Sequence, residues 1–320
     1  MLRIGILGAG HLGRIHLRLV AASPVFELVG FYDPNAAAVD KLVSEKDYRA
    51  FESAEALIDA VDVVSIITPT LSHFEMAEKA IRSKKHVFIE KPIAQNDEEA
   101  QKLVKLASVN GVLGQVGHVE RFNPAFQAIQ PFLDTPIFIE THRLAEFNPR
   151  GTDVSVVLDL MIHDIYIVLS VVDSPIKRID ASAVAVISET PDISNARITF
   201  ENGCVANFTA SRISLKKMRK TRFFQKNAYI AVDYLAKKVE VVKIKDAPNK
   251  TEDLSILLTN AEGKKKQIYF ENPAISETNA ILEELEHFAH CIKSKQIPKV
   301  SLKDCAYALE VAHRVIACIG

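Results

Sequence analysis

The sequence predicts an α/β fold that begins with a doubly wound parallel sheet of the Rossmann type. Three observations predict it. Apolar runs alternate with helical patterns over the first 120 residues or so. A glycine-rich turn joins the first strand to the first helix, and beyond residue 176 short strands follow one another. We therefore place a dinucleotide-binding domain at residues 1–119. Residues 120–320 form a substrate-binding and oligomerisation domain of the α+β class, with a large, mostly antiparallel open sheet.

The first domain follows the pattern of a parallel sheet. Apolar, β-branched runs between turn residues are typical of its buried strands, and apolar residues at three- and four-residue steps are typical of the covering helices. The expected strands are 2–7, 26–32, 61–67, 86–90 and 112–116. The expected helices are 12–20, one that follows Asp33 and ends at about residue 44, 54–60, 71–82 and 97–108.

The second domain reads as a sheet with helices on one face. Short turns such as 201–203 indicate antiparallel pairing. Strands are expected at 137–143, 179–186, 193–200, 205–211, 222–225, 229–234, 239–243 and 267–270, and helices near 123–124 and at 157–172, 278–293 and 302–319. Because the alternation on these strands is apolar, we expect subunits to pair through the uncovered face, as a homodimer or homotetramer.

The glycine-rich turn has the spacing of a dinucleotide site. Gly8 permits the tight turn, Gly10 lets the backbone approach the pyrophosphate, and Gly13 lets helix and strand pack closely. Asp33 ends the second strand, 20 residues beyond Gly13, where a carboxylate binds the adenosine ribose. A carboxylate repels a 2′-phosphate, which favours NAD over NADP. The alternative is that Asp33 is a plain turn residue before Pro34.

The tripeptide Glu90-Lys91-Pro92 closes the apolar strand 86–90. Ligands of parallel sheets bind at the carboxyl ends of the strands. A lysine at this position puts an ammonium group at the mouth of the cofactor crevice. The combination with the glycine turn predicts an oxidoreductase that has Lys91 in its active site.

A second polar pair lies on the apolar helix 157–172. Asp159 and His163 are at positions i and i+4, so both side chains project from one face. A carboxylate beside an imidazole orients it and raises its basicity, which suits a residue that transfers protons. The alternative is a structural histidine at a helix–sheet interface. Asp164 points elsewhere and is a candidate structural hydrogen-bonding group.

Composition excludes several classes of partner. The formal net charge of −1 gives no general attraction for nucleic acid or anionic membranes. No apolar stretch approaches the roughly 20 residues that span a bilayer, and a first strand that starts at Leu2 leaves no room for a signal peptide. The four cysteines have no metal-binding spacing and resemble buried residues of a reducing compartment. We expect a cytoplasmic protein without a metal site.

Taken together, these motifs resemble those of one enzyme family over essentially the whole chain. The motifs are 8–13, Thr68-Pro69 followed by His73, 85–92 with the Glu-Lys-Pro tripeptide, and Asp159-x-x-x-His163. The chain resembles the glucose–fructose oxidoreductase / inositol dehydrogenase / rhizopine-catabolism (Gfo/Idh/MocA) family of NAD(P)-dependent oxidoreductases. The tripeptide and the Asp-x-x-x-His pair are more specific than the glycine motif.

The resemblance implies a role for each motif residue. Lys91 would hold the substrate hydroxyl next to the nicotinamide, and His163, oriented by Asp159, would be the general base in oxidation. Glu90 would support the lysine and the nicotinamide pocket. The cofactor-binding set would be Gly8, Gly10, His11, Leu12, Gly13, Asp33, Thr68, Pro69, His73, Glu90 and Lys91.

Within the family, segment 117–124 is similar to that of dehydrogenases of UDP-N-acetylglucosamine, and so is the basic run 216–222. Basic side chains suit a diphosphate, because arginine binds phosphate through two hydrogen bonds. The expected substrate-binding residues are Arg121, Asn123, Arg150, Lys216 and Arg219. The alternative for the run is a solvated strand face.

Two other functions remain open from the sequence. One is a dehydrogenase of a free sugar or polyol such as inositol, which has no use for a basic run. The other is a non-catalytic sensor of NAD and sugar, although Lys91, Asp159 and His163 are all retained. One departure from the family stands at Tyr166, where many relatives have aspartate.

Overall fold

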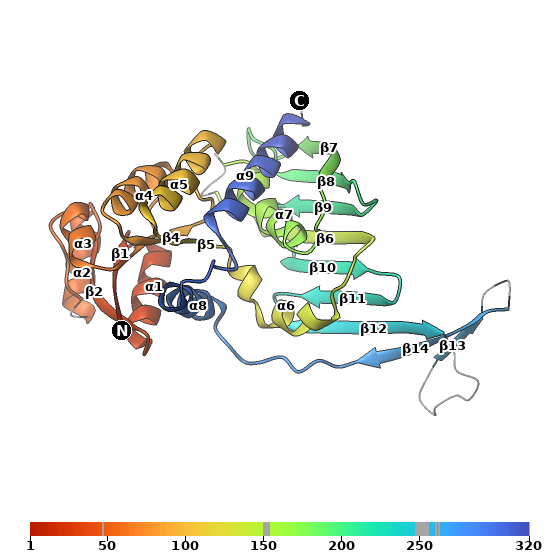
Figure 1. Ribbon diagram of the computed structural model, residues 1–320. Coiled ribbons are helices and arrows are strands. Elements are labelled where there is room, and N and C mark those ends of the chain that lie inside the picture. Colours follow the sequence, from red (N-terminus) through yellow and green to blue (C-terminus); the bar gives the residue numbers. More distant parts are fainter. Residues whose placement is uncertain (47, 150–153, 247–255, 260, 262, 320) are drawn as a thin grey trace. The chain divides into compact units, whose positions relative to one another are not determined.

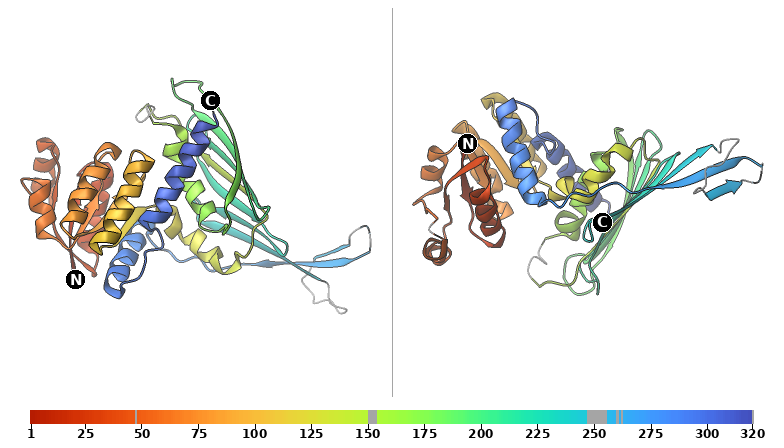
Figure 2. Two further views of the ribbon diagram at one scale, coloured as in Figure 1. Left: turned by 45° about the horizontal axis from the view of Figure 1, so that its top comes forward. Right: turned by 90° about the horizontal axis from the view of Figure 1, so that it is seen from below.

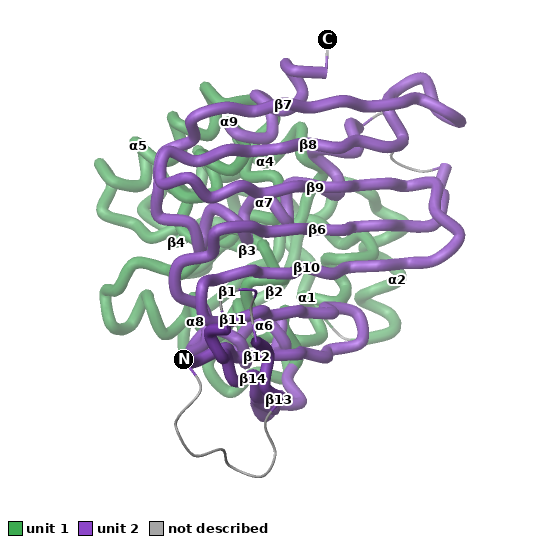
Figure 3. Tube along the Cα trace, turned by 90° about the vertical axis from the view of Figure 1, so that its right-hand side faces the viewer, with its two compact units in different colours: residues 1–122, 279–310 green, residues 123–278, 311–320 purple. Residues whose placement is uncertain are grey.

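The computed structural model describes residues 1–46, 48–149, 154–246, 256–259, 261 and 263–319 (Figures 1 and 2). The chain divides into two compact units, which Figure 3 colours separately. Unit 1 comprises Met1–Phe122 and Asn279–Glu310, and unit 2 comprises Asn123–Thr278 and Val311–Gly320. The predicted fold class is confirmed, since unit 1 contains a parallel sheet and unit 2 a large, mostly antiparallel one.

The sheet of unit 1 has the strand order β2-β1-β3-β4-β5, and its described strands are all parallel. From β1 the chain continues to β2, which pairs with one edge of β1, whereas β3 pairs with its other edge. The direction of winding therefore reverses between β1 and β3. Within the described residues the strands are β1 (Leu2–Leu7), β2 (Phe26–Tyr32), β3 (Val63–Ile66), β4 (His86–Glu90) and β5 (Gly114–Gly117). The helices are α1 (His11–Ala22), α2 (Ala36–Lys46), α3 (Ala54–Ala60), α4 (His73–Arg82), α5 (Asp97–Asn110) and α8 (Ala280–Ser294), with short 3₁₀ turns at Thr70–Ser72 and Val119–Phe122.

One further backbone segment pairs with the outer edge of β2. Ala50 forms an isolated parallel bridge with Phe31, and the Phe31 amide donates to the Arg49 carbonyl at 2.9 Å. Counting this bridge as a strand reduced to one residue gives the six-position order of a dinucleotide-binding sheet. Gly30 lies under this bridge, where a side chain would meet the Arg49 carbonyl at 2.4 Å.

Helix α8 belongs to unit 1 although it lies far along the chain. Leu285, Phe288 and Ala289 are buried in the same apolar cluster as Ile4 and Phe88. This differs from the division at residue 119/120 drawn from the sequence, which left residues 279–310 in the second domain. The difference arises because an amphipathic helix shows that one face is buried but not which sheet buries it.

The sheet of unit 2 has the order β13-β14-β12-β11-β10-β6-β9-β8-β7 within the described residues. Its pairs are antiparallel except β6 with β9. The strands are β6 (Phe138–Leu144), β7 (Ile176–Val184), β8 (Ile193–Phe200), β9 (Val205–Ser211), β10 (Met218–Phe224), β11 (Ala228–Asp233), β12 (Lys238–Asp246), β13 (Ile256–Thr259) and β14 (Lys265–Glu271). The helices α6 (Pro124–Ile129) and α7 (Ile162–Leu169) cover one face of this sheet, as Figure 2 shows, and α9 (Leu302–Ala317) begins in unit 1 and ends in unit 2.

Three details of unit 2 differ from the sequence-based expectation. Strand β10 begins at Met218 rather than 222, so part of the basic run is strand, and β13 was not predicted at all. The expected helix 157–172 begins with a π-helical turn, Val157–Met161, before α7. Charged and exposed residues hide a strand from hydrophobicity patterns, because such patterns detect only burial.

Candidate active site

A crevice of about 700 Å³ opens in unit 1 at the carboxyl ends of β1, β3 and β4. This is the place that the reversal of winding between β1 and β3 predicts for a ligand. Ten of the residues expected to bind a cofactor line it, namely Gly8, Gly10, His11, Leu12, Asp33, Thr68, Pro69, His73, Glu90 and Lys91. Gly13 does not line the crevice.

The three glycines of the turn have different tasks. Gly8 has φ +97°, and a Cβ there would lie 2.5 Å from the Ile67 carbonyl oxygen. A Cβ on Gly13 would lie 2.0 Å from the carbonyl oxygen of Gly8. A Cβ on Gly10 would meet nothing within 4 Å. Gly8 and Gly13 therefore shape the turn, and Gly10 faces the space into which a ligand fits.

The start of α1 suits an anion. Its N-cap residue is Gly10, no side chain caps the helix, and the first turn has no acidic residue. The amide groups of that turn are therefore not occupied by a side chain of their own helix. A pyrophosphate group fits here, because these amides and the helix dipole attract negative charge.

Asp33 holds the glycine turn in place. Its carboxylate accepts hydrogen bonds from the amides of Ala9 at 2.6 Å and of Asn35 at 2.8 Å. Each carboxylate oxygen has two acceptor sites. Capacity therefore remains for the ribose hydroxyls of a dinucleotide, and Asp33 lines the crevice as that role requires.

His73 joins two loops of the crevice wall. Its Nε2 lies 2.8 Å from the carbonyl oxygen of Thr68, and its Nδ1 lies 2.8 Å from that of Pro92. Burial lowers the pKa of this imidazole, and the two carbonyls oppose the shift. The Thr68 hydroxyl is buried without a hydrogen-bond partner in the described part of the chain. That orphaned hydroxyl, in the wall beside Lys91, is the kind of group that a bound nicotinamide amide would satisfy.

In unit 2 the second polar pair lies at the π-helical turn. Asp159 is inside the turn and His163 is in the first turn of α7. Single π turns inside helices occur frequently at functional sites. Asp159 lines a hollow of about 400 Å³, whose other polar lining residues are Glu146, Asn148, Arg212 and Lys217.

Asp164 and Arg212 have structural partners. Asp164 is buried and accepts two hydrogen bonds from Arg143, at 3.1 and 2.9 Å. Arg212 is buried against Asp192 at 3.1 Å and also donates to the carbonyls of Val154 and Pro191. Backbone amides of residues 186–188 bind Asp192 as well and hold the pKa of its carboxyl far below the usual value, against the effect of burial. Breaking such buried pairs is costly, which makes both groups part of the scaffold.

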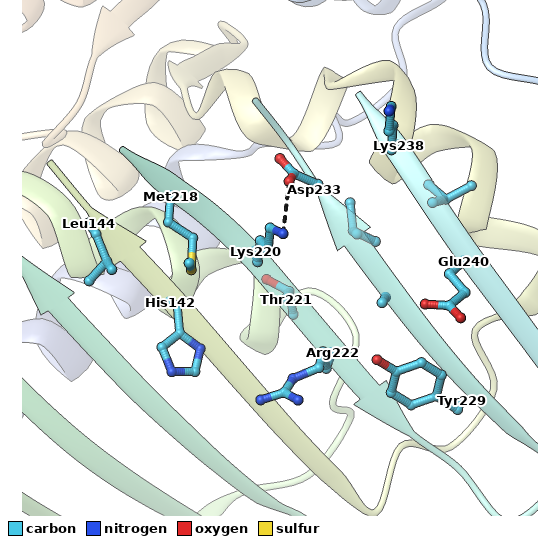
Figure 4. A pocket seen from close by; sticks show the side chains of 13 residues that line it. His142, Leu144, Met218, Lys220, Thr221, Arg222, Tyr229, Asp233, Lys238 and Glu240 are labelled. Atoms are coloured by element: carbon cyan, nitrogen blue, oxygen red, sulfur yellow. Dashed lines mark ion pairs between the residues drawn. The ribbon is translucent and has the colours of Figure 1, made fainter. Parts of the chain in front are cut away.

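The basic run separates onto two faces of the sheet. Arg219 lies opposite Arg143 in the register, so it projects on the side of the sheet that α7 covers. Lys220 and Arg222 project from the other face, where they pair with Asp233 and Glu140. Both basic side chains line a hollow of about 600 Å³. Figure 4 shows them along β10.

The other expected substrate-binding residues have separate locations. Arg121 lies in the turn Val119–Phe122 of unit 1. Asn123 caps α6, since its side chain accepts from the Ala125 amide and donates to the Tyr234 carbonyl. Lys216 lies in the loop between β9 and β10. Arg150 lies outside the described residues.

Sequence reasoning missed a buried polar set behind Glu90. His16 of α1 lies 3.5 Å from the Glu90 carboxylate, and burial, followed by the charge of Glu90, raises the pKa of Glu284 of α8. Both residues are at most 1% exposed. A detectable signal existed, because each is a polar residue on the apolar stripe of its helix.

Two further observations concern ligands and membranes. Among the described residues, no group of three or more His, Cys, Asp and Glu side chains has an arrangement suited to a metal ion. The described helices include none whose length and hydrophobicity would allow it to cross a bilayer.

Comparison with known proteins adds independent observations. The family model GFO_IDH_MocA, described as an oxidoreductase family with an NAD-binding Rossmann fold, matches residues 2–118, and the GFO/IDH/MocA C-terminal domain matches 101–229. UDP-N-acetylglucosamine 3-dehydrogenase of Acidithiobacillus ferrooxidans is 39% identical over 235 residues, which are 73% of this chain and 74% of that protein.

Solved structures agree. The structure of the dehydrogenase GnnA from A. ferrooxidans superposes with a TM-score of 0.88 at 31% identity, over 99% of this chain and 97% of that one. Scyllo-inositol dehydrogenase from Lactobacillus casei, solved with NAD(H) and scyllo-inositol, gives a TM-score of 0.78 at 19% identity, over 99% and 96% of the two chains, and shares the fold.

The two faces of the glycine turn can be separated by mutation. We predict that Gly10→Ala leaves the melting temperature unchanged but weakens NAD binding by about tenfold or more, because the new methyl group enters the crevice. Gly13→Ala should instead lower the melting temperature, since its Cβ meets a backbone oxygen. Thermal melts and calorimetric titration with NAD measure both effects. A melting temperature lowered equally in both variants would contradict this assignment.

Proposed function

This chain belongs to the Gfo/Idh/MocA family of NAD-binding oxidoreductases, and on that premise we propose that it oxidises a hydroxyl group of a nucleotide-activated sugar. The proposed substrate is UDP-N-acetylglucosamine. The observation that carries this proposal is the similarity to the A. ferrooxidans enzyme, at 39% identity over most of both chains. The location of Arg219, on the helix-covered face of the second sheet, supports a substrate with phosphate groups.

The residues supply binding, orientation and proton transfer. NAD, when bound, accepts the hydride from the sugar carbon. We propose that Lys91 binds the reacting hydroxyl and that His163, oriented by Asp159, accepts its proton. Both assignments rest on the Glu-Lys-Pro and Asp-x-x-x-His motifs. A general base of this kind contributes about 10²–10⁴-fold to the rate.

We assign the diphosphate group of the substrate to basic side chains of unit 2 that do not lie on the open face of the sheet. Arg219 is exposed on the covered face, and Lys217 lines the same hollow as Asp159. Lys217 also forms an ion pair with Glu146 at 3.4 Å, and a bound phosphate would take the place of this carboxylate. Arginine recognises phosphate through paired hydrogen bonds, whereas lysine acts as a point charge.

The direct test mixes purified protein with NAD and UDP-N-acetylglucosamine and follows the absorbance of reduced nicotinamide. We expect absorbance to rise and the sugar nucleotide to lose the mass of two hydrogen atoms. A parallel sample contains a 2-oxo acid, which would reveal an enzyme that recycles its cofactor in place. Free inositols and free N-acetylglucosamine serve as competing substrates.

Lys91→Met is the matched control for that assay. It should abolish turnover while NAD still binds, because the glycine turn and Asp33 remain intact. Turnover of inositol but not of the sugar nucleotide would move the assignment to a polyol dehydrogenase. Sugar binding without turnover of any compound would support a sensor.

The separation of the basic run provides a second prediction. Arg219→Ala should raise KM for UDP-N-acetylglucosamine by about tenfold to a hundredfold, because one charge-assisted contact is lost. Arg222→Ala, three residues along the same strand but on the open face, should leave KM within about twofold, as expected for an exposed ion pair. Steady-state kinetics decide this, and equal effects of the two changes would exclude a specific phosphate role for Arg219.

We also propose that copies of this chain associate through the open face of the second sheet. That face is more polar than its sequence suggested, but Phe138, Phe224 and Tyr229 form a row across β6, β10 and β11, with ring centroids 5.7 and 5.2 Å apart. Aromatic residues are enriched in interface cores.

Light scattering of the purified protein measures the mass, which should be two or four times that of the chain. Phe224→Lys should reduce it by placing a charge in the aromatic row. A monomeric mass for the unchanged protein would refute this association.

A further inference from the structure

The wall of the crevice next to Lys91 is backed by a second, buried carboxyl group. Glu90 lines the crevice and its side chain is 14% exposed. Glu284, from α8, is 1% exposed and belongs to the same compact unit. Its carboxyl experiences the charge of Glu90. Two neighbouring carboxyl groups in a buried site cannot both ionise without a large cost in free energy.

The surroundings of Glu284 disfavour its ionised form. Within the described part of the chain it has no cationic partner, and its Oε2 has no hydrogen-bond partner. The side-chain amide of Gln115 donates to the backbone carbonyl of Glu284 at 2.7 Å, not to the carboxyl group. Burial, followed by the charge of Glu90, raises the pKa of Glu284 well above its usual value.

Glu90, in contrast, has polar neighbours at both carboxylate oxygens. The backbone amide of Lys91 donates to its carboxylate at 3.2 Å, and the imidazole of His16 lies 3.5 Å from its other oxygen. The ring of His16 packs against Phe88, with centroids 5.6 Å apart, which fixes its approach from α1. A Cβ on Gly117 would lie 2.6 Å from the Glu90 carboxylate, so this glycine leaves the space that the carboxylate occupies.

We propose that Glu284 is a positioning residue that stays protonated at neutral pH and thereby leaves Glu90 as the single carboxylate charge in the crevice wall beside Lys91. The protonation of Glu284 follows from unit 1 alone. Its consequence for the cofactor rests on the proposed function. The nicotinamide ring is cationic in NAD⁺ and neutral in NADH, so one negative charge in the wall favours the oxidised form.

Other titratable groups near this pair come from three elements. His16 of α1 and His73 of α4 act on Glu90, and Cys305 of α9 lies near Glu284. Burial raises the pKa of the Cys305 thiol, with the charge of Asp304 adding to the shift. A protonated thiol carries no charge, so Cys305 does not compensate an ionised Glu284.

The sign of the pH dependence follows from linkage. A carboxyl whose pKa is raised on folding binds more protons in the folded than in the unfolded chain. Its contribution to stability is complete below the pKa of an unfolded glutamate and is lost as the pH rises through its pKa in the folded protein. Glu284→Gln removes this dependence, because the amide is neutral at every pH.

The test compares thermal melts of the wild-type protein and E284Q without cofactor, between about pH 5 and pH 9. We expect the melting temperature of the wild type to fall relative to that of E284Q as the pH rises. The pH dependence of the difference in free energy of unfolding should correspond to up to about one bound proton. E283Q changes an exposed glutamate on the same helix and should follow the wild-type curve. Parallel curves for wild type and E284Q would overturn the proposal.

A second measurement can be made on the wild-type protein alone. Infrared spectra of the wild-type protein at neutral pH should contain the carbonyl band of a protonated carboxylic acid, which persists above the pH where exposed carboxyls have ionised. Absence of that band would overturn the proposal even if E284Q cannot be purified. Where E284Q folds, the band should be missing from it.

Titrations with NAD⁺ and NADH test the role of Glu90 independently of the proposed reaction. Glu90→Gln should weaken NAD⁺ binding relative to NADH by roughly tenfold, the equivalent of one pKa unit. The conservative variant E284Q should keep the wild-type ratio at neutral pH. Titrations with the two cofactor forms measure this without any sugar, so a wrong substrate assignment leaves it unaffected. An unchanged ratio in Glu90→Gln would refute the role of Glu90 as the single charge.

Discussion

The contact between Gly13 and the carbonyl of Gly8 determines the arrangement of unit 1. A helix can approach a strand this closely only where no Cβ intervenes, and a Cβ on Gly13 would lie 2.0 Å from an oxygen atom. The contact puts the first turn of α1 at the mouth of the crevice. It also fixes the depth of the helix, and His16, one turn further along the same face, therefore reaches the back of Glu90. The anion site and the buried polar set thus depend on one close approach.

The alternation of side chains along β10 has a comparable effect in unit 2. A strand sends successive side chains to opposite faces, so a run of basic residues cannot act as one patch. Arg219 shares a face with the Arg143–Asp164 pair, whereas Lys220 and Arg222 compensate acidic residues on the other face. The sheet therefore separates groups that are adjacent in the chain, and strand register decides which of them is available to a ligand.

Much of unit 1 could be predicted because its signals are local. The boundaries of strand 86–90 and helix 54–60 follow from apolar runs and turn residues, and the structure reproduces both. The crevice residues followed from motif spacing and family resemblance. The burial of His16 and Glu284 had a signal in the apolar stripes of their helices, but the grouping of such residues around Glu90 had none, because it arises only in three dimensions. The π-helical turn at Asp159 also has no signal in a periodicity of three and four residues.

The return of α8 to unit 1 has a consequence for biosynthesis. A ribosome completes the parallel sheet after about a third of the chain, but Leu285 and Phe288, which cover its core, emerge only after residues 123–278 of unit 2 have been made. During that interval the nascent first unit exposes apolar surface around Phe88 and leaves Glu90 without its buried neighbour. Domains made in order along a chain fold one after another. Here the first unit to be started is completed only after most of the second unit has been made, so its closure is a long-range event that awaits a late part of translation.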